Sequence, residues 1–145
     1  MDENKELLTY IYQNVSMGKK SCTNLIKILN GKDNKIKKIV EDELKEYEKY
    51  VKKSEKLMKK YKIDVKEKSF MADVMSKMGM NMEMMKDNSD ARVADMLIKG
   101  FTMGNVDISK KIDRYEHDAE KDILLLAKEI LDFGKKNIEL LKPYL

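Results

Sequence analysis

The stretch LLTYIYQNVSMGKKSCTNLIKILNGKD, residues 7–33, decides the fold class. Its apolar and small residues recur in steps of three and four, which places them on one face of a helix. That face consists of Leu7, Ile11, Val15, Gly18, Cys22, Leu25 and Leu29. Gly31 follows where a helix often ends in a left-handed residue, and Asp33 is suited to open the next helix. We therefore expect two antiparallel helices joined by about two or three residues.

The same spacing recurs in three later segments of the chain. We call the buried face of each predicted helix its seam. The seam of the second helix runs from Ile36 to Tyr61, that of the third from Val93 to Tyr115, and that of the fourth from Ala119 to Leu141. Ser89 is suited to cap the third helix, the fourth is expected to start near Asp118, and Pro143 should end it. The sequence thus predicts an all-α protein, an antiparallel four-helix bundle that forms a single domain over residues 1–145.

A long connection, residues 62–88, separates the second and third predicted helices. Ser69 is suited to cap a short helix inside it, at roughly residues 70–86. Two hairpins joined by one long crossover have the topology of ferritin-like bundles. On this topology and seam pattern, the chain resembles the small bacterial ferritin-like proteins over essentially its whole length. An up-down-up-down bundle with a loosely attached extra helix is the alternative arrangement.

A ferritin-like bundle implies a dinuclear metal site, for which this sequence offers an incomplete ligand set. Such a site takes one Glu from each of two helices and Glu-x-x-His from each of the other two. The sequence contains no Glu-x-x-His, and its single histidine, His117, falls in or beside the last turn. The candidate ligands for iron or another cation are Glu43, Glu46, Asp107 and Glu129. The other interpretation is that these acids are paired carboxylates at the edge of the core.

Five of the six glycines lie inside predicted helices, where each costs about 1 kcal/mol relative to Ala. They are Gly18, Gly79, Gly100, Gly104 and Gly134. The antiparallel register pairs Gly18 with Tyr47, Gly100 with Phe133, and Gly134 with Phe101. Packing of large rings against these glycines is the first interpretation. A mid-bundle pocket bounded by Gly18, Gly100 and Gly104 is the functional alternative.

The predicted helix in the crossover is rich in methionine. Most of its methionines form one apolar stripe that would dock the helix on the bundle. Met80 and Met84 point to the other side and are the candidate surface for self-association or a protein partner. Simple exposure is the second interpretation, and Cu(I) binding by the thioethers is the third.

A lysine-rich stretch follows the second seam, with nine lysines and three acids between Lys49 and Lys68. The candidate polyanion-binding residues are Lys52, Lys53, Lys56, Lys59 and Lys60. No nucleic-acid motif accompanies them, and the only arginines are Arg92 and Arg114. We therefore favour a solvated helix face over nucleic-acid binding.

Composition narrows the class of protein. The net charge is only +4 although 39% of the residues are charged. The longest uncharged run, residues 7–18, is far shorter than the ~20 residues of a membrane span. A start without a signal-peptide pattern and a single cysteine, Cys22, favour a cytoplasmic protein.

Motifs for catalysis are missing from the sequence: it has no glycine-rich phosphate loop and no plausible Cys/His pair. We expect a non-catalytic cytoplasmic helical-bundle protein that acts through self-association or partner binding, as a homo-oligomer or with a protein partner. No cofactor is predicted. The alternative is a ferritin-like metal-binding protein with a degenerate carboxylate site.

Overall fold

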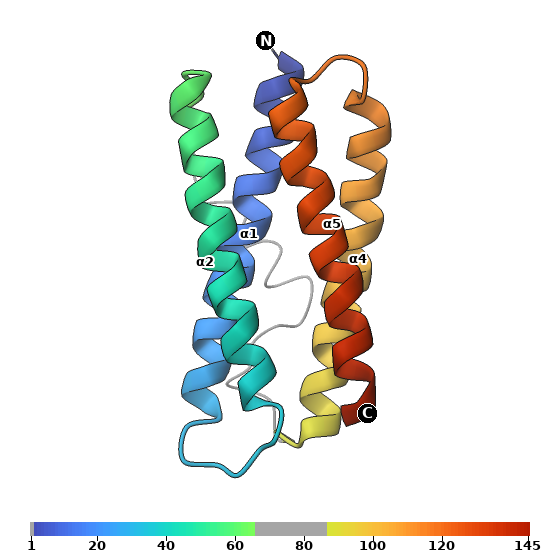
Figure 1. Cartoon of the computed structure of the whole chain (residues 1–145). Coiled ribbons are helices and arrows are strands. Elements are labelled where there is room, and N and C mark those ends of the chain that lie inside the picture. The colour runs from blue at the N-terminus through green and yellow to red at the C-terminus, as the bar shows by residue number, and fades with distance from the viewer. Residues whose placement is uncertain (1, 66–86) are drawn as a thin grey trace.

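The computed structural model of the protein describes residues 2–65 and 87–145, and over these residues it is helical without strands. The α-helices of this part are α1 (Asp2–Ile28), α2 (Lys37–Lys60), α4 (Asp90–Tyr115) and α5 (Lys121–Leu141). A 3-10 turn, η2 (Lys142–Tyr144), ends the chain. The helices run side by side in an elongated bundle (Figure 1), as the sequence predicts.

The helices pack as hairpins. α1 packs extensively along α2, and α4 along α5. The hairpins meet mainly where α2 lies beside α5, whereas α1 and α4 make fewer contacts with each other. The packing therefore has a closely joined α2–α5 side and a more open α1–α4 side.

The core forms from the predicted seams. Every seam residue predicted between Leu7 and Leu29 is buried, including the lone Cys22. The later helices contribute most of the remaining core, with Val40 from α2, Ile108 from α4 and Ile123 from α5 among its buried residues. Helical periodicity alone was sufficient to find these residues, because a seam that always faces its neighbours carries the apolar side chains.

The connection between α1 and α2 differs from its prediction. Gly31 adopts the expected left-handed conformation, with φ +77°. However, α2 begins at Lys37, so the connection is longer than predicted, and Asp33 does not cap it. The carboxylate of Asp90, at the start of α4, instead accepts the backbone N–H groups of Lys35 (3.1 Å) and Ile36 (3.4 Å).

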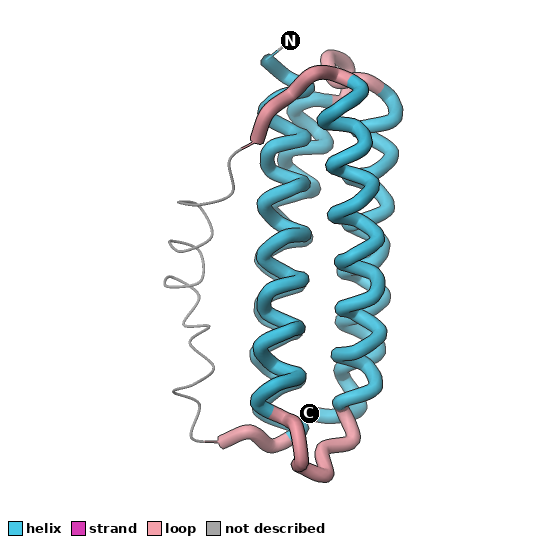
Figure 2. Tube along the Cα trace, turned by 90° about the vertical axis from the view of Figure 1, so that its left-hand side faces the viewer, coloured by secondary structure: helices cyan, strands magenta, loops and turns pink. Residues whose placement is uncertain are grey.

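These hydrogen bonds between the hairpins place the starts of α2 and α4 at the same end of the bundle. At the opposite end, the Tyr61 hydroxyl donates to Asp122 at the start of α5, over 2.6 Å. The end of α2 and the start of α4 consequently lie at opposite ends of the bundle (Figure 2).

The remaining helix ends follow local signals, with one shift. Ser89 caps α4 as predicted, its hydroxyl accepting the Arg92 N–H over 3.3 Å. α5 starts at Lys121 rather than near Asp118, because the Glu120 N–H donates to the buried Asn4 side chain of α1 over 2.8 Å.

Candidate functional site

The middle of the bundle contains a cavity of about 240 Å³, here called the mid-bundle cavity. Most of its lining comes from α1 and α4, which make fewer contacts with each other than α2 and α5 do. α2 contributes Glu43 and Tyr47, and α5 contributes Phe133 and Gly134. The cavity therefore lies on the α1–α4 side, with α2 and α5 behind it.

Glycines make room for this cavity. Each of Gly18, Gly100, Gly104 and Gly134 lines it. A Cβ atom at Gly18 would overlap the Tyr47 ring, so this pair lies as the register predicts. A Cβ at Gly104 would meet only Asn14 Nδ2, at 3.8 Å, which leaves that position open.

One predicted pair is wrong. Gly134 faces the side chain of Asn105, which a Cβ atom would overlap, and not the ring of Phe101. Asn105 lies one turn of α4 beyond Phe101. Phe101 instead packs against the neighbouring Phe133, with ring centroids 5.6 Å apart. Gly79 lies outside the described residues.

Glu43 is the buried acid of the cavity. Only 1% of its surface is exposed, and its Oε1 accepts a weak hydrogen bond from Cys22 Sγ at 4.0 Å. Its Oε2 is buried and has no hydrogen-bond partner among the described residues; the same holds for Ser21 Oγ. Burial, with a smaller contribution from the charge of Asp42, raises the pKa of Glu43 from 4.5 to about 8.

The other ionisable groups nearby are held neutral. Burial and the charge of Glu43 raise the pKa of the Cys22 thiol well above its ordinary value. Burial also raises the pKa of Tyr10 to about 12. Both side chains line the cavity, and neither supplies an anionic nucleophile near pH 7.

Aromatic rings form one wall. The Tyr47 ring packs edge-on against Phe133, with centroids 5.1 Å apart, and lies parallel to Phe101 at 6.4 Å. Phe101 and Phe133 meet edge to face at 5.6 Å. This cluster presents π-faces and edges to the cavity from α2, α4 and α5.

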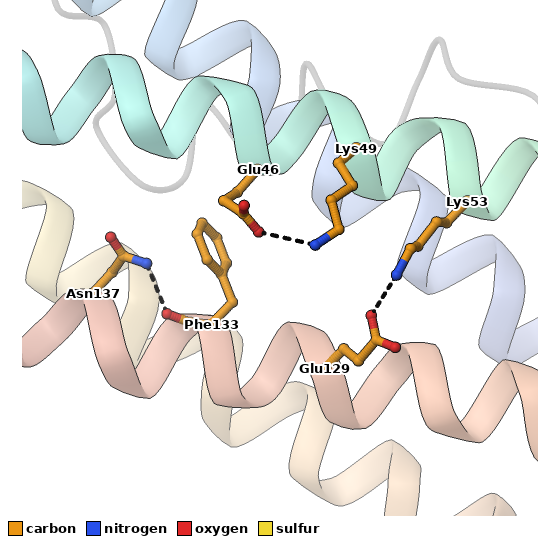
Figure 3. Close-up of polar contacts among 6 residues, drawn as sticks. All are labelled: Glu46, Lys49, Lys53, Glu129, Phe133 and Asn137. Carbon is orange, nitrogen blue, oxygen red and sulfur yellow. Dashed lines mark hydrogen bonds and ion pairs between the residues drawn. The ribbon is translucent and has the colours of Figure 1, made fainter.

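The four candidate metal ligands do not converge in the structure. Glu46 pairs with Lys49 (3.6 Å) and Glu129 with Lys53 (2.9 Å), both outside the cavity (Figure 3). Asp107 lines the cavity on the exposed side of α4, away from the buried Glu43.

Within the described residues, no group of three or more His, Cys, Asp or Glu side chains could hold a metal ion. His117 is exposed in the turn between α4 and α5, where the sequence places it. The metal-site hypothesis thus gains no ligand cluster from this part of the chain.

The other candidates are surface features or lie outside the described residues. Met80 and Met84 belong to the latter group, so their proposed partner surface remains a prediction. The five candidate lysines of α2 are exposed, and two of them, Lys53 and Lys60, pair with acids of α5. Within residues 2–65 and 87–145, none of the helices combines the length and apolarity that a membrane crossing requires.

Sequence reasoning missed Ser21 and the isolation of Glu43. The signal for Glu43 was its place in the second seam, three residues after Val40 and four before Tyr47. A carboxyl at such a position is buried by its helix face, whatever acids lie nearby in the sequence. Ser21 carries no comparable signal, since it only flanks the seam residue Cys22.

Comparison with known proteins gives no match for this chain among protein-family models, curated proteins or solved structures. The fold and the cavity therefore carry the functional argument by themselves. They define a helical bundle with a mostly apolar cavity, partly open to solvent, whose lining includes one buried carboxyl group.

Proposed function

We propose that this protein is a non-catalytic helical-bundle binding protein and that the mid-bundle cavity is its binding site. The observation that carries the proposal is Glu43 Oε2, which lines the cavity without a hydrogen-bond partner among the described residues. Buried polar atoms are nearly always hydrogen-bonded, because an unpaired one costs about 1–3 kcal/mol. A bound molecule with a polar group would supply the partner.

The size of the cavity suits a small organic molecule. A closed apolar cavity of roughly 150 Å³ is sufficient to bind benzene. The mid-bundle cavity, at about 240 Å³, has room for a ring with a short substituent. Binding is favoured over catalysis because the nucleophilic groups of the cavity, Cys22 and Tyr10, are held neutral by burial.

The ferritin-like topology is part of this proposal. It is supported by the shared end at which α2 and α4 begin, because a connection from the end of α2 to the start of α4 then joins opposite ends of the bundle. The cytoplasmic location expected from the sequence also remains part of the proposal.

Toluene binding tests the cavity as a site. We expect toluene to raise the Tm of the wild-type protein by about 2–4 °C. Gly104→Leu should abolish this shift, because the added side chain enters the open space in front of Gly104. Gly104→Ala is the matched control and should keep the shift, since one methyl group leaves most of the cavity empty.

The proposal fails if toluene leaves the wild-type Tm unchanged, or if Gly104→Leu responds like the wild type. Circular dichroism on each variant confirms that the helical fold is retained. Isothermal titration of toluene into the same variants gives the stoichiometry, for which we expect one molecule per chain.

Self-association is the second candidate function, and a surface feature of α4 favours it. Met103 and Val106 lie three residues apart on this helix, with 53% and 49% of their surfaces exposed. Sedimentation should then give a mass above the 17.0 kDa of one chain. The double variant Met103→Glu/Val106→Glu should return to 17.0 kDa, while the control Leu125→Glu, on exposed α5 surface, should not. A wild-type chain that sediments as a monomer contradicts this candidate.

A further inference from the structure

We propose that the mid-bundle cavity selects a small organic ammonium ion, such as a primary amine with an apolar body, and holds its charged head at Glu43 and Ser21. This inference rests on the proposed function, in which the cavity is the binding site, and names the ligand class that the site takes. Two observations support it: buried oxygen atoms that lack hydrogen-bond partners among the described residues, and the charge of the residues that line the cavity.

The two oxygens are both acceptors for the same kind of group. Glu43 Oε2 and Ser21 Oγ line the cavity, are buried, and lack hydrogen-bond partners among the described residues. A primary ammonium group has three N–H donors and no acceptor, which suits a carboxylate oxygen and a hydroxyl oxygen alike. A neutral alcohol donates only one hydrogen bond. Pairing with an ionised carboxylate would also be charge-assisted, which strengthens it about twofold.

The charge of the cavity lining disfavours an anionic ligand. Among the described lining residues, the acids are Glu43 and Asp107, and none is Lys, Arg or His. An anionic ligand would meet like charge there and no basic partner, which disfavours its entry. A cation meets a buried carboxyl inside and a second carboxylate on the exposed α4 side.

The aromatic wall fits the same ligand. The rings of Tyr47, Phe101 and Phe133 all line the cavity. Aromatic faces attract ammonium groups and also pack against hydrocarbon, so they suit both parts of an amine with an apolar body. Ile108 and Ile130 add further apolar surface to the lining.

Charge pairing at Glu43 couples binding to proton release. Around this carboxyl group, Asp42 and Tyr47 lie on the same helix, Cys22 faces it from α1, and Tyr10 of α1 and Asp107 of α4 line the same cavity. The lining residues of α5 carry no ionisable group. Burial holds the pKa of Glu43 at about 8, so the empty site is largely protonated at pH 7.

An ammonium ion that binds there ionises Glu43, and one proton leaves to solvent. Affinity for a permanently protonated amine should therefore rise almost tenfold per pH unit from pH 6 towards pH 8, then level off. A neutral ligand should bind equally at each pH.

The test compares three probes of similar size by isothermal titration at pH 8: benzylamine, toluene and benzoate. We expect benzylamine to bind at least about tenfold more tightly than toluene, and benzoate not to bind. Glu43→Gln should remove the preference for benzylamine and keep toluene binding, which also shows that the variant folds with its cavity intact.

The outcomes separate this inference from the proposed function. If toluene binds but benzylamine gains nothing over it, or gains equally in Glu43→Gln, the ammonium inference is overturned while the cavity remains a binding site. If neither probe binds, both proposals fail. Titrating benzylamine at pH 7 in two buffers of different ionisation enthalpy should report release of about one proton; zero release overturns the inference as well.

Discussion

The α2–α5 side and the α1–α4 side of this bundle are built in different ways. Between α2 and α5, long side chains bridge the helices, with Lys53 paired to Glu129 at 2.9 Å (Figure 3) and both Lys60 and Tyr61 reaching Asp122 at 2.6 Å. The buried Phe133 ring of α5 also packs against Tyr47 and Tyr50 of α2.

Between α1 and α4, Tyr115 donates to Glu6 and Lys111 lies 4.9 Å from the centre of the Tyr10 ring, but glycines line the middle of the two helices. Gly18, Gly100 and Gly104 come from these helices, and the cavity takes the place of packed side chains. The comparison shows how one bundle can be stable and still have room inside. The closely packed side holds the helices in position. On the open side, the cavity leaves fewer packing contacts between side chains, which costs stability.

The largest effect we predict concerns the open side and its response to pH. Because the pKa of Glu43 rises from 4.5 in a solvated chain to about 8 in the fold, the folded state holds a proton that the unfolded state releases between these values. Its contribution to stability is thus complete below pH 4.5 and is lost as pH rises to about 8. At about 1.4 kcal/mol per pH unit, the loss approaches 5 kcal/mol.

Glu43→Gln isolates this contribution, because Gln does not titrate. Between pH 5 and pH 9, the free energy of unfolding of the wild type should therefore fall by several kcal/mol more than that of the variant. Urea unfolding at pH 5, 7 and 9 measures the difference. Parallel pH profiles for the two proteins would show that Glu43 is not protonated in the fold.

The second prediction breaks the closely packed side. Phe133 is buried and touches Tyr47, Tyr50 and Phe101, with ring centroids 5.1–5.6 Å away. Phe133→Ala should lower the free energy of unfolding by about 4 kcal/mol, because it removes these contacts and joins a new void to the cavity. Phe133→Leu, which keeps most of the volume, should cost less than half as much. Equal losses in urea unfolding would contradict the packing argument.

Much of the fold could be predicted because its signals are local. The three- and four-residue spacing found the buried face of α1, and Ser89 and Gly31 marked helix ends through their own backbone and side-chain chemistry. Cys22 and His117 were placed correctly by the same reasoning, one on a seam and one in a turn.

What escaped prediction depends on contacts between distant parts of the chain. The backbone N–H groups just before α2 are bound by Asp90, more than 50 residues away, so no nearby residue predicts this contact. The contact of Asn105 with Gly134 depends on how α4 and α5 pack together, so neither helix predicts it alone. Likewise, Glu43 and Glu46 are neighbours in sequence, but their helix faces differ: one is buried and the other pairs with Lys49.

A matched pair of glycine substitutions compares tight and open packing on the α1–α4 side. Gly18→Ala should lower the free energy of unfolding by about 1–2 kcal/mol, because its Cβ overlaps the Tyr47 ring by more than the gain in helix propensity offsets. Gly104→Ala should raise it by about 0.5–1 kcal/mol, since its Cβ has ordinary contact distance to Asn14. Thermal unfolding of both variants gives the comparison, and a shift of the same sign in both would mean that the two glycines have equal room.

The smallest effect we predict lies in the polar bridges of the α2–α5 side. Lys53 and Glu129 meet at 2.9 Å, but their side chains remain 44% and 36% exposed, so water and salt screen the pair. A double-mutant cycle with Lys53→Ala and Glu129→Ala should give a coupling of no more than about 0.5 kcal/mol, shrinking further in 1 M salt. A coupling above about 1.5 kcal/mol that persists in salt would contradict this. In that case the ion pair itself would hold the two helices together, whereas we expect the packing of Phe133 against Tyr47 and Tyr50 to do so.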